Sequence, residues 1–173
     1  MVFWWIYDRV CIYLCSLNLQ RMPLIKSISG IRGTIGGRPN EGLTPLDVVK
    51  FTSAFGFWLL QKTEESQPKI VVGRDARISG EMVSNLVCST LQGLGIKVID
   101  LGLSTTPTVE VAVPYYDAIG GIIITASHNP KEWNALKLLN KKGEFISAND
   151  GAEVLELADK DEVKFAEVDA LGT

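Results

Sequence analysis

The sequence is poor in the residues that mark metal centres and disulfide scaffolds. Its 173 residues include one histidine and three cysteines. A single histidine excludes a histidine-rich zinc site, and Cys11, Cys15 and Cys88 do not have the spacing of paired zinc ligands. An odd number of cysteines without a disulfide framework favours a reducing compartment. We therefore expect a cytoplasmic protein that depends on neither zinc nor disulfide bonds.

The chain also lacks an excess of basic residues. It carries 17 Lys and Arg against 20 Asp and Glu, a formal net charge of −3, so no basic surface indicates a nucleic-acid partner. Apolar residues make up 46% of the chain and charged residues 21%, and the mean hydropathy is +0.17. This composition excludes a disordered tail or a collagen-like repeat. At this length it is typical of one folded domain with its own core.

No apolar run is long enough to predict a membrane span. Residues 1–21 are rich in tryptophan and cysteine, but Asp8 and Arg9 divide them into pieces shorter than the roughly 18 to 20 residues that a bilayer needs. A secretory signal also has its positive charge first, whereas Arg9 lies in the middle. We interpret residues 1–21 as an atypical N-terminal extension, read in frame before a true start at Met22. A membrane-associating segment and a genuine docking element are the alternatives.

From Met22 onward, short apolar stretches alternate with segments of helical periodicity. The expected strands are 24–28, 69–73, 96–101, 119–125 and 133–139, with a hairpin arm at 144–146, and the expected helices are 44–62, 79–94, 106–114 and 152–158. This alternation predicts an α/β fold, a three-layer α/β/α sandwich with a mixed, mostly parallel sheet. We expect a domain at 22–158 and a linker at 159–173 that leads toward a second domain.

Polar clusters follow three of the expected strands. Arg32 lies in a glycine-rich loop expected at 29–37, residues 74–77 (Arg-Asp-Ala-Arg) follow the second strand, and residues 127–129 (Ser-His-Asn) follow the most buried one. Ligands of open parallel sheets gather at the carboxyl ends of the strands. Guanidinium groups bind phosphate bidentately, so these clusters suit a phosphorylated ligand.

Each cluster also has a purely structural interpretation. Arg74 and Asp75 could pair and brace a turn, His128 could be a capping donor, Ser127 could cap a turn, and Lys137 could be a solvated charge. Other catalytic schemes fit poorly. Ser127 does not lie in a Gly-x-Ser-x-Gly motif, and the sequence has no Gly-x-x-x-x-Gly-Lys-Ser/Thr phosphate loop.

Four segments carry a resemblance to a known family. They are Ser29-Gly-Ile-Arg-Gly33, Val72-Gly-Arg-Asp-Ala-Arg-Ile-Ser-Gly80, Thr125-Ala-Ser-His-Asn-Pro130 and Trp133-Asn-Ala-Leu-Lys137. In this order they resemble motifs of the α-D-phosphohexomutases, the superfamily of phosphoglucomutase, phosphomannomutase and phosphoglucosamine mutase. The resemblance covers the chain from Met22 to about Ala158, which corresponds to the first of the family's four domains.

The resemblance implies a role for each matching residue. Ser127 would carry the phosphoryl group, an oxygen of which is one ligand of the family's Mg²⁺, and His128 would orient the sugar or its phosphate. Arg32 and Lys137 match the acid–base pair for the sugar hydroxyl. A supporting or substrate-binding shell is matched by Arg74, Asp75, Arg77 and Asn129.

The implied reaction interconverts hexose 1-phosphate and hexose 6-phosphate, with a hexose 1,6-bisphosphate as intermediate and activator. Such phosphoryl transfer depends on positioning and charge neutralisation. The family's Asp-x-Asp-x-Asp magnesium loop is absent from the sequence, in which Asp159 and Asp161 form one such pair. The sugar loop of the third domain and the phosphate loop of the fourth are absent as well.

We therefore expect a fragment that holds the phosphoserine domain and is inactive alone. Its expected partners are a hexose phosphate and domains two to four of the same protein, with neither nucleic acid nor a membrane among them. A stand-alone domain that binds sugar phosphates or a protein partner without turnover is one alternative. A membrane-tethered interaction protein that uses the apolar N-terminal segment is another.

Overall fold

The domain is built around one mixed β-sheet. The computed structural model describes residues 24–27, 30–160 and 162–173. The expectations for residues 1–21 lie outside these residues. Within them the sheet has six strands in the order β1-β2-β6-β5-β3-β4. The strands are β1 (Ile25–Ser27), β2 (Gly30–Thr34), β3 (Lys69–Arg74), β4 (Lys97–Leu103), β5 (Gly120–Ile124) and β6 (Trp133–Leu139).

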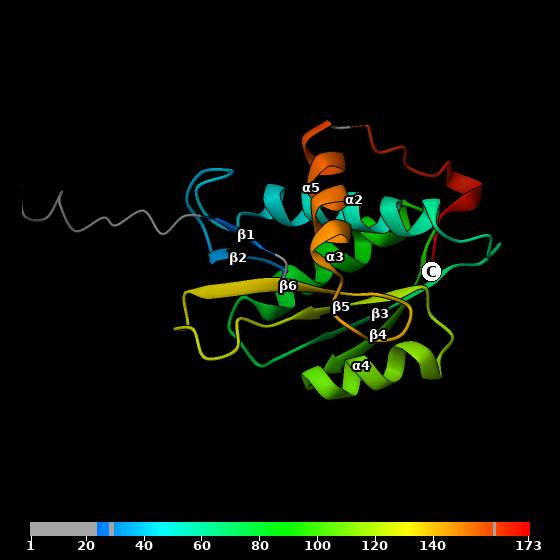
Figure 1. Ribbon diagram of the computed structural model, residues 1–173. Coiled ribbons are helices and arrows are strands. Elements are labelled where there is room, and N and C mark those ends of the chain that lie inside the picture. Colours follow the sequence, from blue (N-terminus) through cyan, green and yellow to red (C-terminus); the bar gives the residue numbers. More distant parts are fainter. Residues whose placement is uncertain (1–23, 28–29, 161) are drawn as a thin grey trace, which may run out of the picture.

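The helices cover both faces of the sheet and confirm the three-layer α/β/α architecture. They are α2 (Pro45–Gln61), α3 (Gly80–Gly93), α4 (Thr106–Tyr115) and α5 (Ala148–Lys160), followed by the 3₁₀ helix η1 (Val168–Ala170). Helices α2, α3 and α5 lie on one face and α4 lies on the other (Figure 1). Alternate residues of β3 point to the two sides. Ile70 and Val72 pack with the first group of helices, and Val71 packs with α4. No helix of the described residues is long and apolar enough to cross a bilayer.

The expectation of a mostly parallel sheet needs correction. Strand β3 is parallel to β4 and β5, but the pairs β1–β2, β2–β6 and β5–β6 are antiparallel. Strand β6 follows β5 through a turn without a crossover helix, so it returns antiparallel to β5. Parallel pairing is confined to the half of the sheet formed by β5, β3 and β4.

The glycine-rich segment around Arg32 is a strand rather than the predicted loop. Residues 30–34 form β2, which pairs with β6. Gly30 has a φ of +115°, and a Cβ atom there would lie 2.1 Å from the carbonyl oxygen of Leu136. The glycine therefore permits a backbone approach between β2 and β6 that a residue with a side chain would prevent.

Helix α2 begins as the sequence predicts. The backbone N–H of Thr44 donates to Asp47 Oδ2 (3.0 Å), the backbone N–H of Asp47 donates to Thr44 Oγ1 (3.4 Å), and Pro45 occupies the first turn. This reciprocal pair satisfies two backbone donors at the helix start. Phe51 and Phe55 of α2 are fully buried against the sheet.

The segment after β6 is shorter in strand and longer in helix than predicted. The expected hairpin arm is reduced to a single bridge between Leu139 and Phe145. Ser147 then starts α5, since its hydroxyl donates to Asp150 Oδ2 (2.7 Å) and accepts from the Asp150 backbone N–H (3.2 Å). This local cap explains why the helix begins at Ala148, before the predicted residue 152.

The last part of the chain packs back onto the domain. Helix α5 continues through Lys160, and residues 162–173 return to the end of α3 and the start of β4. The carbonyl of Gly93 accepts from Ala166 N–H (2.8 Å), and the carbonyl of Thr173 accepts from Val98 N–H (2.7 Å). A Cβ at Gly172 would lie 2.0 Å from the Ile96 carbonyl oxygen. The segment that the sequence predicts as a linker is therefore also a packed part of the domain.

Candidate functional site

The predicted serine lies on a turn at the carboxyl end of β5. Ser127 and His128 are exposed, whereas Thr125 and Ala126 before them are buried. Ser127 has a φ of +56°, in the left-handed region that residues other than glycine seldom adopt. The backbone N–H of Asn129 donates to the carbonyl of Ala126 (3.1 Å) and closes the turn. Strained residues of this kind are found at functional sites when the surrounding structure holds them in place.

Arg77 binds this turn through its whole guanidinium group. Its Nη1 donates to the carbonyls of Pro130 (2.8 Å) and Trp133 (3.0 Å), and its Nη2 donates to those of Ser127 (2.7 Å) and Asn129 (2.9 Å). Its Nε donates to Asp75 (3.1 Å). A guanidinium has five N–H donors, and all five are used here. Arg77 therefore holds the serine turn and has no donor left for a ligand.

Asp75 connects this guanidinium to β5. Its Oδ1 accepts from the backbone N–H of Arg77 (3.0 Å), and its Oδ2 accepts from Arg77 Nε and from Thr125 Oγ1 (2.6 Å). The Thr125 hydroxyl in turn accepts from the backbone N–H of Ser127 (3.1 Å). The partner of Asp75 is thus Arg77 rather than Arg74, which makes only a 3.4 Å contact to the Asp75 carbonyl. Arg74 keeps most of its donors for another partner.

Arg32 and Lys137 share one face of the sheet. Arg32 lies opposite Ala135, two residues before Lys137 on β6, and Lys137 lies opposite Ile123, which packs on the side of α4. Arg32 Nε is buried without a hydrogen-bond partner, and Lys137 Nζ lies 5.9 Å from the ring centroid of Phe145. No hydrogen bond or ion pair joins either side chain to the serine turn within the described residues. The register places Arg32 level with the start of that turn, because Ala135 also accepts from Thr125 N–H.

Two polar contacts at this edge involve residues of the motif segments for which no individual role was predicted. Thr125 was predicted at the end of a buried strand and at the start of the 125–130 motif, and its hydroxyl joins Asp75 to Ser127. Asn134 is fully buried in β6, and its Nδ2 donates to Ser79 Oγ (3.0 Å) at the start of α3. An asparagine inside an apolar strand is the one sequence signal that indicates such a contact, because a buried amide requires a partner.

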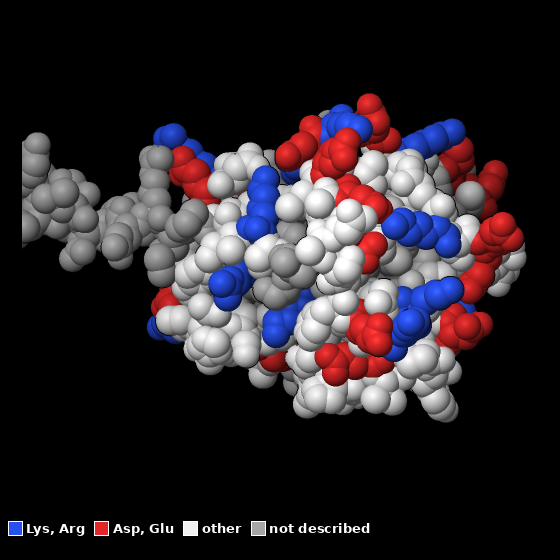
Figure 2. All heavy atoms as spheres, viewed as in Figure 1, with Lys and Arg blue, Asp and Glu red and all other residues white. Residues whose placement is uncertain are grey.

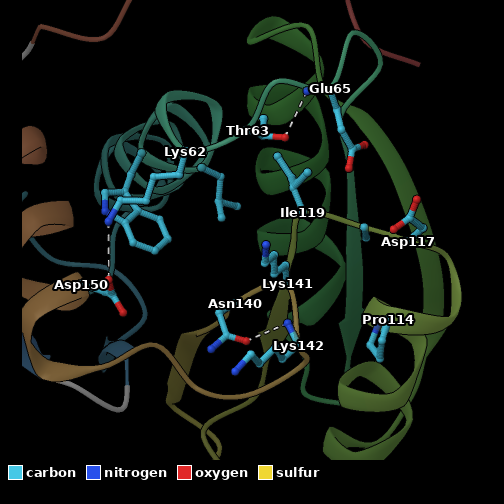
Figure 3. A pocket seen from close by; sticks show the side chains of 13 residues that line it. Lys62, Thr63, Glu65, Pro114, Asp117, Ile119, Asn140, Lys141, Lys142 and Asp150 are labelled. Carbon is cyan, nitrogen blue, oxygen red and sulfur yellow. Dashed lines mark hydrogen bonds and ion pairs between the residues drawn. The ribbon is translucent and has the colours of Figure 1, made fainter.

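A hollow lies at the opposite edge of the sheet, at the amino ends of the parallel strands. It has a volume of about 570 Å³ and is formed by the ends of α2 and β6 and by the segment before β5 (Figure 3). Lys62 and Asp150 lie together on one side of it, with Nζ 3.6 Å from Oδ1, and Lys62 also contacts Glu153 (2.8 Å). None of the residues predicted for the site lines this hollow. Basic and acidic side chains are interspersed over the face that Figure 2 shows.

This fold, with its serine turn after β5 and the 75–77 segment after β3, defines a three-layer α/β/α domain. Residues 24–164 match the family model described as phosphoglucomutase/phosphomannomutase, alpha/beta/alpha domain I. Because the match covers most of the chain, the chain belongs to this family.

Curated relatives agree with this assignment. The chain is 43% identical over 127 residues to a phosphoglucomutase/phosphomannomutase of Thermococcus kodakarensis, which covers 72% of this chain and 28% of the relative. It is 38% identical over 133 residues to a phosphoglucosamine mutase of Limosilactobacillus reuteri. This match covers 77% of this chain and 29% of the relative. The chain therefore spans less than a third of the length of these relatives.

Solved structures share the fold. A putative phosphomannomutase from Thermus thermophilus superposes with a TM-score of 0.70 at 27% identity, covering 80% of this chain and 30% of that one. A phosphoglucomutase/phosphomannomutase family protein from Burkholderia thailandensis superposes with a TM-score of 0.71 at 22% identity, covering 87% and 32%. The second likeness shows the fold alone.

Proposed function

We propose that this chain supplies the phosphoryl-carrying serine of a phosphohexomutase that interconverts hexose 1-phosphate and hexose 6-phosphate. The observation that carries the proposal is the geometry of Ser127. The serine is exposed at a strand end, in a left-handed conformation that hydrogen bonds hold on both sides. A serine that stores a phosphoryl group between turnovers needs such exposure, and its alignment requires a fixed backbone.

In the proposed reaction the phosphoryl group moves between Ser127 and the sugar. The bond from phosphorus to Ser127 Oγ breaks while a bond from phosphorus to a sugar hydroxyl oxygen forms. The proton of that hydroxyl passes through the uncharged amine of Lys137 to the departing Ser127 Oγ, while Arg32 stays charged, and the product is a hexose 1,6-bisphosphate. After the intermediate reorients, its other phosphoryl group returns to Ser127 Oγ, and the proton of that hydroxyl passes through Lys137 to the departing sugar oxygen.

The charged side chains around Ser127 are proposed to have two roles, which are to hold the serine turn and to neutralise the substrate phosphate. Arg77 holds the turn because its five donors are bound, and Asp75 supports it. Arg32, whose buried Nε has no partner, and Arg74 are proposed to neutralise the charge of substrate phosphate. His128 and Asn129 are proposed to orient the sugar phosphate beside Ser127.

The described residues do not make a complete site for the magnesium ion that the family implies. They contain no group of three or more His, Cys, Asp or Glu side chains that could hold a metal ion. A phosphate on Ser127 would offer one oxygen ligand, and the other ligands would have to come from elsewhere. The steps proposed above therefore use only side chains of this chain and groups of the sugar.

The wider proposal concerns the rest of the protein. Since the match covers less than a third of the length of the relatives, we propose that residues 22–158 work together with further domains and that residues 159–173 lead toward the second one. Turnover by the 173-residue chain alone is expected to be negligible, and the choice among glucose, mannose and glucosamine phosphates is assigned to those domains. A cytoplasmic location suits the free thiol of Cys88.

Intact-mass analysis after incubation with a hexose 1,6-bisphosphate tests the proposal. We expect a gain of one phosphoryl group, located on Ser127 by peptide mapping, and its loss when a hexose monophosphate is added. Ser127→Ala should abolish the gain, whereas Ser89→Ala, at an exposed serine on α3, should not change it. A chain that binds sugar phosphates but gains no phosphoryl group would favour the binding domain without turnover.

A further inference from the structure

We infer that Thr125 is a positioning residue for Ser127, because its hydroxyl is the link through which the Asp75–Arg77 ion pair holds the backbone of the serine. The contact itself is independent of the chemistry of the site. Its consequence for phosphoryl transfer rests on the function proposed above.

The direction of both hydrogen bonds of Thr125 follows from the chemistry of the partners. Asp75 is ion-paired with Arg77, and an ionised carboxylate only accepts. The single hydroxyl proton of Thr125 is therefore donated to Asp75 Oδ2 (2.6 Å). The backbone N–H of Ser127 only donates, so it occupies a lone pair of the same hydroxyl oxygen (3.1 Å). Thr125 is 8% exposed, so little water competes for this oxygen.

The carbonyl group of Ser127 is also bound by the Asp75–Arg77 ion pair. The Ser127 carbonyl accepts from Arg77 Nη2 (2.7 Å), and Arg77 Nε is bound to the carboxylate oxygen that also accepts from Thr125. Both peptide groups that flank the Ser127 Cα are therefore held by one charged pair. Such a double attachment accounts for a φ of +56° at a residue with a side chain.

Loss of the Thr125 hydroxyl should free the N–H of Ser127 while its carbonyl stays bound. The position of Oγ then varies, and fewer molecules hold it in line for phosphoryl transfer. The competing explanation is that Thr125 only fills space at the end of β5. Thr125→Val keeps the branched shape and removes the hydroxyl, whereas Thr125→Ser keeps the hydroxyl and removes the methyl group, so the two variants separate the explanations.

Amide hydrogen exchange of the 173-residue chain, followed by NMR, tests the contact directly. We expect Thr125→Val to raise the exchange rate of the Ser127 amide roughly fivefold, the loss expected for one hydrogen bond. The amides of Ile122 to Ile124 should keep their rates, and Thr125→Ser should stay near the parent rate. An unchanged Ser127 rate in Thr125→Val, or an equal rise in Thr125→Ser, would overturn the inference. If Thr125→Val is too unstable to assign, Thr125→Ala against Thr125→Ser provides the same contrast.

Single-turnover phosphorylation of Ser127 by hexose 1,6-bisphosphate tests the consequence. We expect Thr125→Val to lower the maximal rate on the order of tenfold with little change in the half-saturating concentration, and Thr125→Ser to restore it. A parent chain that takes up no phosphoryl group contradicts the proposed function, while the exchange measurement still decides whether Thr125 positions Ser127. An exchange effect without any change in the transfer rate would overturn the catalytic consequence.

Discussion

The edge of the sheet at the carboxyl ends of its parallel strands and the edge at their amino ends use their charged side chains differently. At the edge that carries Ser127, Arg77 and Asp75 turn inward and bind main-chain groups of one turn. At the opposite edge, Lys62 contacts Asp150 and Glu153 beside a hollow, and these carboxylates also accept hydrogen bonds from Ser147 and Trp58. The volume of a hollow therefore does not mark the proposed site in this domain. The convergence of polar groups on one short backbone segment does.

The charged side chains at the two edges also differ in exposure to solvent, and this should change how much each contributes to the stability of the fold. The side chain of Arg77 is 11% exposed, whereas that of Lys62 is 46% exposed. Removal of Arg77 leaves Asp75, whose side chain is 31% exposed, without its ion-pair partner at a half-buried position that solvates it less well than bulk water does. An exposed pair is screened and exchanges its contacts for water at little cost. Substitutions at the two edges should consequently differ most in how well water solvates the groups that lose their partner.

The largest expected effect is at Arg77. Arg77→Ala removes five donors and leaves Asp75 and four carbonyls without their partner, so the free energy of unfolding should fall by about 3 kcal/mol. Urea denaturation measures the change, and Arg38→Ala, at an exposed arginine, is the matched control. A loss at Arg77 no larger than that of the control would remove the energetic contrast between the two edges.

Ser127 itself should show an effect of the opposite sign. Ser127→Gly relieves the left-handed backbone strain and adds chain entropy to the unfolded state, so the net gain in stability should be about 0.5–1 kcal/mol. Ser127→Ala keeps the Cβ atom and should show no such gain. Thermal and urea unfolding of the two variants measure the difference. Equal stabilities would mean that the turn does not strain Ser127.

The smallest effect is expected at the opposite edge and depends on pH. Hydrogen bonds from Lys62 and Trp58 lower the pKa of Glu153, and hydrogen bonds from Ser147, with the charge of Lys62, lower that of Asp150. Groups with a lowered pKa stabilise the fold above their ordinary pKa, and that contribution is lost as the pH falls below about 4. Urea midpoints at neutral and acid pH should therefore differ less in Lys62→Met than in the parent chain.

At neutral pH, Lys62→Met should change the stability no more than Lys164→Met, which removes a solvent-exposed lysine. A large neutral-pH loss at Lys62 would show that the opposite edge is held by its ion pairs after all.

Elements with a strong local signal could be predicted from the sequence. The Thr44, Pro45 and Asp47 signature gives the start of α2, and the apolar run before Thr125 gives a strand buried on both faces. The motif segments also indicate the correct edge for Ser127 and the 74–77 cluster. Strand β2 could not be predicted, because its glycines are typical of loops and its pairing partner β6 is about a hundred residues away in the chain.

The contacts of Arg77 could not be predicted either. Its targets are main-chain carbonyls, which every residue has, and they converge only because the turn after Ser127 bends them toward one point. The sequence indicates that a guanidinium is present but does not distinguish one that holds a turn from one that binds phosphate. The same limit applies to Thr125, whose β-branched side chain is typical of any strand end.

The returning segment of residues 162–173 also bears on how this domain behaves next to other copies of itself. Strand β4 lies at the end of the strand order, and an edge strand can template pairing with another chain. The carbonyl of Thr173 occupies the N–H of Val98, and the carbonyl of Gly93 is covered in the same way by Ala166. A version of the domain cut after Lys160 would expose these backbone groups, one of which belongs to β4, and we expect it to self-associate more readily than the whole chain.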